Sequence, residues 1–295
     1  MLKSLISTIP KMERTRLRAL YFNQKKKFID TLFSYGATEL ETALHAIGIR
    51  SGDTVLVHSS FGPFSGFRGS PDEAIDAFLK SVGPTGNLLM VSMPYLSSSY
   101  EYLQTLKCFD VRKTISRMGL VSEAFRRRSG VLRSLHPTHP ILAFGPKADW
   151  IISGHEKCLY PCGPGSPFEK LLKLNGKVLF YGVSEYTFTF YHYLEHIVKD
   201  ELPFPVYEDQ PFKVQVIDHQ GHARNVTTYV YSRETIPRRR PGILFAELIR
   251  RKQWKKSRLG NTPIILIDVS HALSSTLDLA KRGIFFYEMS PSSGK

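Results

Sequence analysis

The chain has 295 residues, of which 42% are hydrophobic and 22% are charged, and this composition excludes a disordered, collagen-like or coiled-coil protein. Its net charge of +14 is concentrated in two segments. Residues 1–27 hold eight basic side chains and one acidic one, and residues 233–258 hold ten basic and two acidic ones. The rest of the chain is near neutral, so the positive charge belongs to two patches and not to the whole surface.

The first 35 residues are expected to form a basic N-terminal arm, in which Lys25, Lys26 and Lys27 follow a mixed basic and apolar stretch. The arm is predicted to be either a solvated segment or a short amphipathic helix. Together with residues 233–258, it is a candidate surface for docking on a membrane or on a partner. No stretch approaches the roughly 20 apolar residues of a membrane span. The N-terminus also lacks the long apolar core of a secretory signal.

Three cysteines, Cys108, Cys158 and Cys162, cannot build a disulfide framework and suit a reducing compartment. Cys158 and Cys162 have no second Cys or His pair at zinc-ribbon spacing, so both are interpreted as free thiols. The sequence therefore predicts a cytoplasmic protein, with a peripheral position at the inner membrane surface as the option that the basic arm leaves open.

From residue 38 onward the pattern becomes regular. Thr38 is the predicted N-cap of a helix that ends at Ile47, with Glu41 in the capping-box position. A strand over 53–58, a helix over 71–82 and a strand over 87–91 form a βαβ unit, which indicates an α/β fold with a largely parallel sheet. The remaining predictions are helices over 118–128, 189–199, 241–252 and 270–281, strands over 141–144, 177–182 and 264–267, and a hairpin of 212–217 and 226–231. No linker divides the chain, so residues 36–295 are expected to form one domain.

The loop that follows the first strand is rich in Gly and Ser and leads to a helix N-terminus at residue 71. Such a loop presents backbone N–H groups and the positive end of a helix to an anion. It has neither the Walker ending nor the glycine spacing of a dinucleotide loop. The pattern leaves two alternatives open, an anion cradle and an ordinary loop.

A second candidate site is the segment 133–140, in which two histidines, His136 and His139, stand beside prolines. A Ser and a Thr accompany them, and this set suits a site that polarises a carbonyl or handles a proton. A turn with surface histidines explains the same pattern.

A third candidate is the segment 191–196, where His192 and Glu195 are three residues apart and share one helix face. A carboxylate that orients an imidazole is the usual arrangement of a general base. The same letters fit the inverted zincin motif, in which His192 and His196 bind zinc and Glu195 activates water. That zinc-dependent hydrolase would need a third ligand, for which Glu247 is the helical acid in reach. A purely structural helix face is the remaining alternative. No Gly-x-Ser-x-Gly nucleophile elbow occurs.

Taken together, these segments resemble the antibiotic N-acetyltransferase family, typified by the aminoglycoside 3-N-acetyltransferases. The similarity covers about residues 38–285, and its most specific block is RMGLVSEAFRRRSGVLRSLHPTHP at 117–140. The other matching stretches are GDTVLVHSS at 52–60, GPKADWIISGH at 145–155, GSPFEKLLKLNGKVLFYGV at 165–183, FYHYLEH at 190–196 and RLGN at 258–261. The resemblance implies a three-layer αβα sandwich around a central, largely parallel mixed sheet. It also implies direct acetyl transfer from acetyl-CoA, as co-substrate, to an amine, with no metal.

The resemblance also implies roles for individual residues. His192 corresponds to the catalytic histidine of the family's His-x-x-Glu motif, Glu195 to its acidic partner, and His136 to the histidine of the His-Pro motif. Thr138 is a candidate donor to the oxyanion of the tetrahedral intermediate. The residues expected at the coenzyme site lie in the loop and in the 117–140 block: His58, Ser59, Ser60, Phe61, Gly66, Gly69, Arg117 and Ser134.

The basic segment 233–258 departs from the family pattern and affects the expected acceptor. Aminoglycosides are polycations, which acidic clefts attract. A nucleotide-linked amino sugar or an acidic glycan fits a basic border better, provided that Arg238, Arg239 and Arg240 lie at the cleft. The same basic runs permit a non-enzymatic nucleic-acid-binding protein, but they are not interleaved with aromatic residues, so no nucleic-acid partner is expected. A dimer is a candidate oligomeric state.

Overall fold

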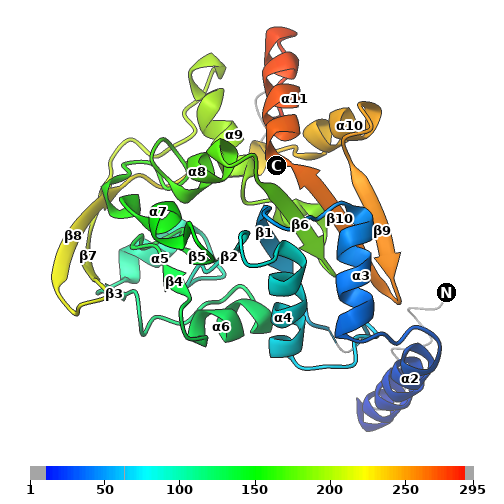
Figure 1. Cartoon of the computed structure of the whole chain (residues 1–295). Coiled ribbons are helices and arrows are strands. Elements are labelled where there is room, and N and C mark those ends of the chain that lie inside the picture. Colours follow the sequence, from blue (N-terminus) through cyan, green and yellow to red (C-terminus); the bar gives the residue numbers. More distant parts are fainter. Residues whose placement is uncertain (1–10, 63, 290–295) are drawn as a thin grey trace.

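The computed structural model describes residues 11–62 and 64–289, and this part of the chain folds around a seven-stranded mixed sheet (Figure 1). The strand order across the sheet is β4-β5-β2-β1-β6-β10-β9. The strands are β1 (Thr54–Ser59), β2 (Asn87–Val91), β4 (Leu132–Arg133), β5 (Ile141–Phe144), β6 (Lys177–Tyr181), β9 (Lys255–Leu259) and β10 (Thr262–Asp268).

Parallel pairing occupies the centre of this sheet, where β1 lies between β2 and β6. On one side β2 pairs antiparallel with β5, and on the other side β6 pairs antiparallel with β10. The β1-α4-β2 crossover imposes the parallel pairing, because only a long connection returns the chain to the same end of the sheet. The mixed α/β sheet is confirmed, with its parallel part confined to the three central strands.

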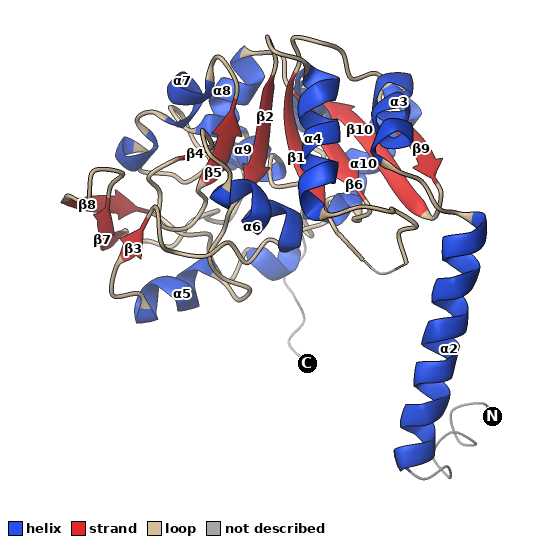
Figure 2. Ribbon diagram, turned by 60° about the horizontal axis from the view of Figure 1, so that its bottom comes forward, coloured by secondary structure: helices blue, strands red, loops and turns tan. Residues whose placement is uncertain are grey.

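Helices cover both faces of the sheet, as a three-layer sandwich requires (Figures 1 and 2). Alternate residues of β1 show the two layers, because Val55 and Val57 pack in one core cluster and Leu56 in the other. The first layer consists of α3 (Ala37–Ile47), α4 (Pro71–Val82) and α6 (Leu120–Arg127). The second consists of α7 (Ala148–Ile152), α8 (Pro167–Lys173), α9 (Tyr191–Ile197), α10 (Gly242–Arg250) and α11 (Val269–Lys281). Short 3-10 turns cover His155–Lys157, Glu185–Thr187, Lys199–Glu201 and Ile236–Arg238.

A smaller three-stranded sheet lies beside the main body, with its own apolar cluster and the helix α5 (Ser99–Thr105). Its strands are β3 (Phe109–Asp110), β7 (Phe212–Ile217) and β8 (Ala223–Thr228). The predicted hairpin is therefore confirmed, but its second strand begins three residues earlier than expected. Asp218 accepts the backbone N–H groups of Gln220 and His222, and this tight turn brings the chain back into pairing at Ala223.

The start of α3 differs from the expected cap at Thr38 with Glu41. Gly36 is the N-cap, and its backbone N–H donates to the Glu39 carboxylate at 3.0 Å. The capping interaction therefore lies two residues earlier than predicted, because Glu39 rather than Glu41 is the acid that reaches back to the first turn.

The basic arm contains a 22-residue helix, α2 (Lys11–Leu32), which stands away from the body of the protein (Figure 2). It is longer than the short helix expected, and its C-terminal half attaches it to the domain. The ring of Phe22 lies 4.7 Å from that of Phe64, and Ile29 is buried. No helix within the described ranges is both long and apolar enough to cross a membrane.

The connection after α2 already belongs to the packed domain. Tyr35 is buried, and its hydroxyl lies 2.7 Å from that of Tyr181 and donates to Thr262 Oγ1 at 2.6 Å. Through these contacts Tyr35 binds β6 and β10. Tyr35 lies one residue before residue 36, where the domain is expected to begin, and that boundary stays a prediction.

The N-cap of α4, the helix of the βαβ unit, gives a testable prediction of stability. Ser70 Oγ accepts the N–H of Glu73 at 3.2 Å, and the Glu73 carboxylate accepts the N–H of Ser70 at 2.7 Å. Ser70→Ala leaves the Glu73 N–H without its acceptor and is expected to lower the free energy of unfolding by about 1 kcal/mol. The thermal midpoint should fall by about 3 °C, measured by calorimetry. Ser70→Thr keeps the cap and is the matched control; equal midpoints for Ser70→Ala and wild type would contradict the account.

Candidate active site

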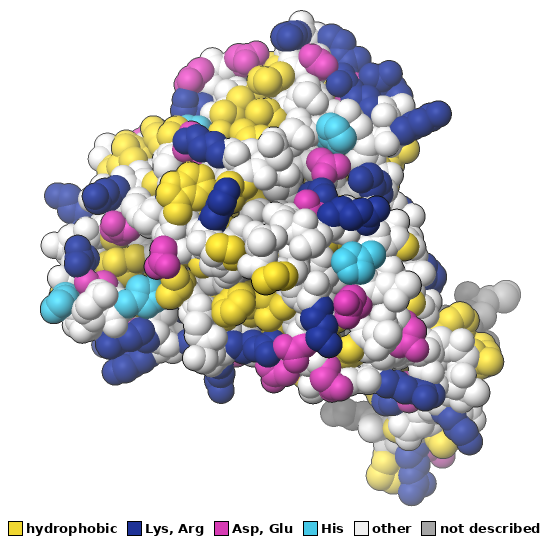
Figure 3. All heavy atoms as spheres, viewed as in Figure 1, with side chains coloured by type: hydrophobic (Ala, Val, Ile, Leu, Met, Phe, Trp, Pro, Cys, Tyr) yellow, Lys and Arg dark blue, Asp and Glu magenta, His cyan; other side chains and the backbone are white. Residues whose placement is uncertain are grey.

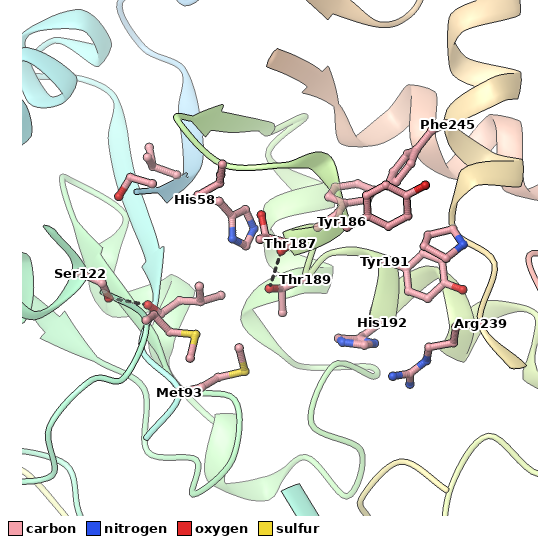
Figure 4. A pocket seen from close by; sticks show the side chains of 17 residues that line it. His58, Met93, Ser122, Tyr186, Thr187, Thr189, Tyr191, His192, Arg239 and Phe245 are labelled. Carbon is pink, nitrogen blue, oxygen red and sulfur yellow. Dashed lines mark hydrogen bonds between the residues drawn. The ribbon is translucent and has the colours of Figure 1, made fainter. Parts of the chain in front are cut away.

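A cavity of about 420 Å³ lies at the carboxyl ends of the three parallel strands (Figure 4). In an open α/β sheet this edge is where ligands bind, because the loops after the strands diverge there. Side chains from the end of β1, from the loop after β6, from the start of α9 and from the segment before α10 form its wall. The lining residues are Val57, His58, Ser59, Val91, Met93, Met118, Ser122, Val183, Tyr186, Thr187, Phe188, Thr189, Tyr191, His192, Arg239, Pro241 and Phe245.

His192 and Glu195, which the sequence predicted to share a helix face, are in direct contact. Both belong to α9, and His192 Nδ1 lies 2.6 Å from Glu195 Oε2. The side chain of Glu195 is fully buried, whereas that of His192 is 20% exposed and lines the cavity. When Nδ1–H donates to the carboxylate, Nε2 is the unprotonated nitrogen of the neutral ring. The imidazole is therefore oriented as a base at the cavity wall.

Two further side chains hold the Glu195 carboxylate. Arg239 donates from Nε to Oε1 at 2.6 Å and from Nη2 to Oε2 at 2.9 Å. The hydroxyl of Tyr287, beyond α11, donates to Oε1 at 2.5 Å. A buried carboxylate needs such charge-assisted partners to offset its lost hydration. Three segments far apart in the sequence thus meet at one buried anion.

These contacts fix the charges of the pair. Burial alone would raise the pKa of Glu195, but the Arg239 guanidinium and the bonds from His192 and Tyr287 hold that pKa below its ordinary value. Burial and the nearby Arg239 charge lower the pKa of His192, and they outweigh the opposite effect of Glu195. At neutral pH the pair is therefore an ionised carboxylate and a neutral imidazole, which is the state that can accept a proton.

Aromatic rings restrict how the His192 imidazole can turn. The ring of Tyr231 stacks on it at 4.5 Å, and the ring of His139 meets it edge-on at 5.8 Å. The guanidinium of Arg239, which binds Glu195, lies 4.8 Å from the centre of the Tyr231 ring. Tyr231 therefore contacts both His192 and Arg239. The base is thus packed between rings as well as hydrogen-bonded.

His58 enters the cavity from the opposite side, at the end of β1, where Figure 4 shows its ring pointing inward. It is 5% exposed and stacks on Phe180 at 5.5 Å. Its Nε2 is buried without a hydrogen-bond partner among the described residues. Burial lowers the pKa of His58 to about 3, so the ring is neutral. A neutral imidazole with an unused nitrogen can take a hydrogen bond from, or give one to, a bound molecule. Ser59 follows it in the cavity wall.

The rest of the predicted loop lies outside the cavity lining. Ser60 borders a separate hollow, and Phe61 packs edge-on against Phe67. Gly66 has φ +86°, and a Cβ there would meet the carbonyl oxygen of Phe33 at 2.1 Å, so this glycine allows the loop to approach the end of α2. Gly69 lies against the ring of Phe67 beside the cap of α4. The structure thus separates Ser60, Phe61, Gly66 and Gly69 from His58 and Ser59.

The 133–140 turn is buried, which contradicts the alternative of a turn with surface histidines. His136 is fully buried and stacks on His155 at 4.4 Å. Its Nδ1 accepts the N–H groups of Thr138 and His139 at 3.3 Å each. Neither His136 nor Thr138 lines the cavity, so the structure does not bring them to His192 as reacting groups. His139, whose ring contacts His192, connects the turn to the site.

Ser134 and Arg117, from the same block, also lie outside the lining. Ser134 is fully buried, where its Oγ contacts His155 Nδ1 and accepts the N–H of Ile141, each at 2.8 Å. Arg117 is exposed beside the cavity-lining Met118, and its N–H donates to the carbonyl of Met93 at 2.8 Å. Arg117 is therefore at the rim, and Ser134 supports the turn.

The zinc motif does not assemble in this fold. His196 does not line the cavity, and its Nδ1 lies 3.0 Å from the hydroxyl of Tyr207. Glu247, on α10, is bound by Arg250 and by Arg251, the residue that follows the helix. Across residues 11–62 and 64–289, no group of three His, Cys, Asp or Glu side chains converges as metal ligands would. A zinc-dependent hydrolase requires three such ligands around one metal ion.

Tyr287 is a site residue that the sequence did not single out, and neither is the contact of Arg239 with Glu195 predicted from it. The sequence named Arg239 only as one of three arginines that would favour an anionic acceptor if they border the cleft, and of the three only Arg239 lines the cavity. In the structure Arg238 pairs with Glu234 and Arg240 with Glu288. Tyr287 has no signal in the sequence, since its partner lies 92 residues away.

Comparison with known proteins gives one consistent match. The family model described as "Aminoglycoside 3-N-acetyltransferase" matches residues 56–280. An aminoglycoside N(3)-acetyltransferase III from Salmonella sp is 28% identical over 183 residues, which is 55% of this chain and 64% of that protein. An aminoglycoside N(3)-acetyltransferase VIII from Streptomyces fradiae is 31% identical over 187 residues, 58% of this chain and 64% of that protein. The chain thus matches less than two thirds of the length of these curated relatives.

Solved structures with the same fold span more of the chain. The sisomicin-bound structure of AAC-VIa has a TM-score of 0.71 and 25% identity, and the match covers 85% of this chain and 100% of that one. AAC-IIIb with CoASH has a TM-score of 0.70 and 24% identity, with 87% and 99% covered. The aminoglycoside acetyltransferase AAC(3)-Xa, at 22% identity, has a TM-score of 0.74, with 90% and 98% covered. The sandwich is therefore an established fold of these proteins.

The buried histidines predict how stability depends on pH. Burial lowers the pKa of His155 to about 3, like that of His58, and the pKa of His136 and His139 also lies well below the ordinary value. Below pH 6.5 these histidines bind protons in the unfolded chain but stay neutral in the native state. Each of them therefore lowers the free energy of unfolding by about 1.4 kcal/mol per pH unit.

Urea unfolding between pH 7.5 and about 4.5, above the range where most carboxylates titrate, should show the free energy of unfolding falling steeply below pH 6.5. His58→Phe should lower the proton uptake on unfolding by about one in this range. A free energy of unfolding that stays level from pH 6.5 to about 4.5 would show that these rings are not buried in the neutral form.

Proposed function

The chain belongs to the aminoglycoside 3-N-acetyltransferase family, and we propose that it transfers the acetyl group of acetyl-CoA to an amine of an amino sugar. The observation that carries this proposal is the His192–Glu195 pair at the cavity wall, with Nδ1 of the imidazole 2.6 Å from a buried carboxylate. Acyl transfer to an amine needs a base at the acceptor nitrogen, and this pair supplies one.

The cavity suits a thioester co-substrate. Its apolar wall, which includes Met93, Met118 and Phe188, fits a flexible chain with few charges. The ring of His58 lines the cavity, and its Nε2 has no hydrogen-bond partner among the described residues. Outside it, α6 begins without a side-chain cap next to Met118 and the exposed Arg117, so its first N–H groups can face an anion such as a pyrophosphate. The first turn of α4 suits an anion less well, because Ser70 caps it and it holds Asp72 and Glu73. The acid in the first turn of α6, Glu123, is paired with Arg126 and Arg127.

Acetyl-CoA supplies an activated carbonyl carbon, and the chain supplies proton transfer and positioning. His192 Nε2 takes a proton from the amine as the nitrogen forms its bond to the carbonyl carbon. The same imidazolium then returns that proton to the departing sulfur, so that the C–S bond breaks without a covalent enzyme intermediate. Glu195 stabilises the transient positive charge and keeps the ring in the required tautomer, while Arg239 and Tyr287 position Glu195.

Stabilisation of the oxyanion falls to a group that lines the cavity. Thr138, the donor expected from the sequence, is fully buried and does not line the cavity. His58, in its Nε2-protonated form, is the better candidate, because its ring points into the cavity from the side opposite His192. The preorganised position of a donor in a partly dry cavity is what makes it effective.

The charge of the cavity bears on the acceptor. None of the described lining residues is Asp or Glu, and the charge of Glu195 is already balanced by Arg239. A polycation such as sisomicin would find no free carboxylate there to offset the loss of hydration of its ammonium groups. Arg238 and Arg240 do not line the cavity and have acidic partners of their own, so the wall is close to neutral rather than strongly basic. We therefore favour a nucleotide- or glycan-linked amino sugar, with few positive charges, over an aminoglycoside.

Replacing the proposed base should separate chemistry from binding. His192→Ala is expected to lower turnover by a factor of about 10² to 10⁴, because a positioned general base contributes that much. The affinity for acetyl-CoA, measured by calorimetry, should stay nearly unchanged. Release of the CoA thiol reports turnover. His271→Ala, on the exposed side of α11, is the matched control and should behave as wild type. Full turnover in His192→Ala would assign the base to another residue.

The acceptor is tested by competition between charge classes. Thiol release should give a higher kcat/KM with a nucleotide-linked amino sugar than with gentamicin or sisomicin, because the cavity holds no unpaired carboxylate within the described residues. Added salt should not lower the gentamicin value, since there is no acidic field to screen. A kcat/KM for either aminoglycoside above that of every nucleotide-linked or glycan-linked amine tried would reverse this choice.

A further inference from the structure

The projecting helix α2 has apolar side chains on two different sides, and one side is partly covered by the protein, since Phe22 stays 42% exposed there. Phe22 contacts the ring of Phe64, and Ile29 is buried at 4% exposure. With 100° between successive residues, Phe22 and Ile29 lie on one side of the helix. The Arg68 guanidinium adds a bond to the carbonyl of Asp30 at 2.6 Å. This side attaches α2 to the 61–68 loop.

The second apolar side faces solvent. At the same helical spacing, five large side chains between Leu17 and Leu32 gather within about a third of the circumference, together with the uncharged Gln24 and Thr31. The charged Glu13 and Arg14 lie on the same side, but only in the first turn of the helix. Each of the five is more than half exposed: Leu17 53%, Leu20 57%, Tyr21 66%, Phe28 57% and Leu32 62%. We call these five residues the outer stripe. A solvated arm has no use for such a stripe, because exposed apolar area of this kind marks a surface that binds something.

Basic side chains border the outer stripe on both edges. Arg16 and Lys27 lie along one edge, and Arg18 and Lys25 along the other, at the helical spacing. Figure 3 shows Lys and Arg side chains next to hydrophobic ones on the projecting helix. An apolar sector between two basic edges is the arrangement of helices that lie in the interface of an anionic bilayer.

The charges of α2 decide which partner could cover the outer stripe: a second copy of the chain, a nucleic acid or a bilayer. The helix carries seven Lys and Arg against two acidic residues. A second copy of α2 would place two strongly basic helices together, which like-charge repulsion opposes. A nucleic acid would neutralise the basic edges but leave the outer stripe in water. A bilayer with anionic headgroups suits both the outer stripe and its basic edges, because acyl chains cover the stripe and phosphates contact the basic edges.

We propose that α2 is a membrane-surface helix, which lies in the plane of an anionic bilayer with the outer stripe turned inward. Its length of about 33 Å runs along the surface, and its other side keeps the α/β domain attached through Phe22 and Ile29. The domain therefore rests on the bilayer and does not enter it. This inference is independent of the proposed acetyl transfer.

Sedimentation with lipid vesicles tests the proposal on the full chain. The protein should bind vesicles of phosphatidylcholine with about one third phosphatidylglycerol, and bind vesicles of phosphatidylcholine alone at least about tenfold more weakly. Leu17→Ser with Phe28→Ser should weaken binding to the anionic vesicles by at least about tenfold. The matched control is Ile249→Ser with Leu277→Ser, which alters two exposed apolar residues on α10 and α11 and should change nothing. All four positions are exposed, so the thermal midpoint should stay constant and exclude misfolding.

Charge is tested separately. Replacing Arg16, Arg18, Lys25 and Lys27 with Ser should weaken binding to the anionic vesicles about as strongly, and raised salt should do the same to wild type. Failure to bind anionic vesicles would overturn the proposal, as would binding that Leu17→Ser with Phe28→Ser leaves intact. A dimer in vesicle-free solution that this double variant abolishes would assign the outer stripe to a second copy of the chain instead.

Discussion

The buried carboxylate of Glu195 is the constraint on which the rest of the site depends. An ionised carboxylate is costly to bury, and here it is stabilised by donors from α9, from the segment before α10 and from the segment after α11. Removing one donor would leave a partly unpaired buried charge. The cluster consists of His192, Glu195, Arg239 and Tyr287. It holds the segments before α10 and after α11 against α9, and it sets the charge and tautomer of His192. Stability and chemistry share a single set of hydrogen bonds.

The cavity forms because the three central strands are parallel. Their carboxyl ends deliver His58 and Ser59 from β1 and the 183–189 segment from β6 to one edge of the sheet. The buried turn at 133–140 stands behind this edge, where His139 meets His192. Its histidines are neutral and packed, so the turn acts as a rigid support for the base. A site of this kind keeps its geometry without a ligand because each part is held by the core.

Periodicity and turn residues predicted most of the central elements, since β1, α4 and β2 each carry a strong local pattern and the capping signal of α4 lies within four residues. They did not predict β9, because Lys255–Leu259 is a basic and mostly exposed edge strand with no apolar run. The spacing of His192 and Glu195 predicted their contact, since three residues on a helix fix it. The same logic could not find Arg239 or Tyr287, whose contacts to Glu195 exist only after distant segments pack. The roles predicted for His136 and Thr138 came from the residue types of the His-Pro segment and from the family resemblance, and neither shows whether such a segment will be buried outside the cavity lining.

The central claim is that Glu195 orients His192 as a base, and that burial and the nearby Arg239 charge keep the pKa of His192 low, so that its ring is neutral. Nitrogen NMR of histidine-labelled protein, with the His192 signal assigned by its loss in His192→Gln, measures both properties directly. The account predicts a neutral ring protonated at Nδ1 at pH 7 and a pKa below the ordinary 6.5. In Arg239→Gln this pKa should rise, since the nearby positive charge is removed while Glu195 remains. An imidazolium at pH 7 in the wild type, or a neutral ring protonated at Nε2, would contradict the account.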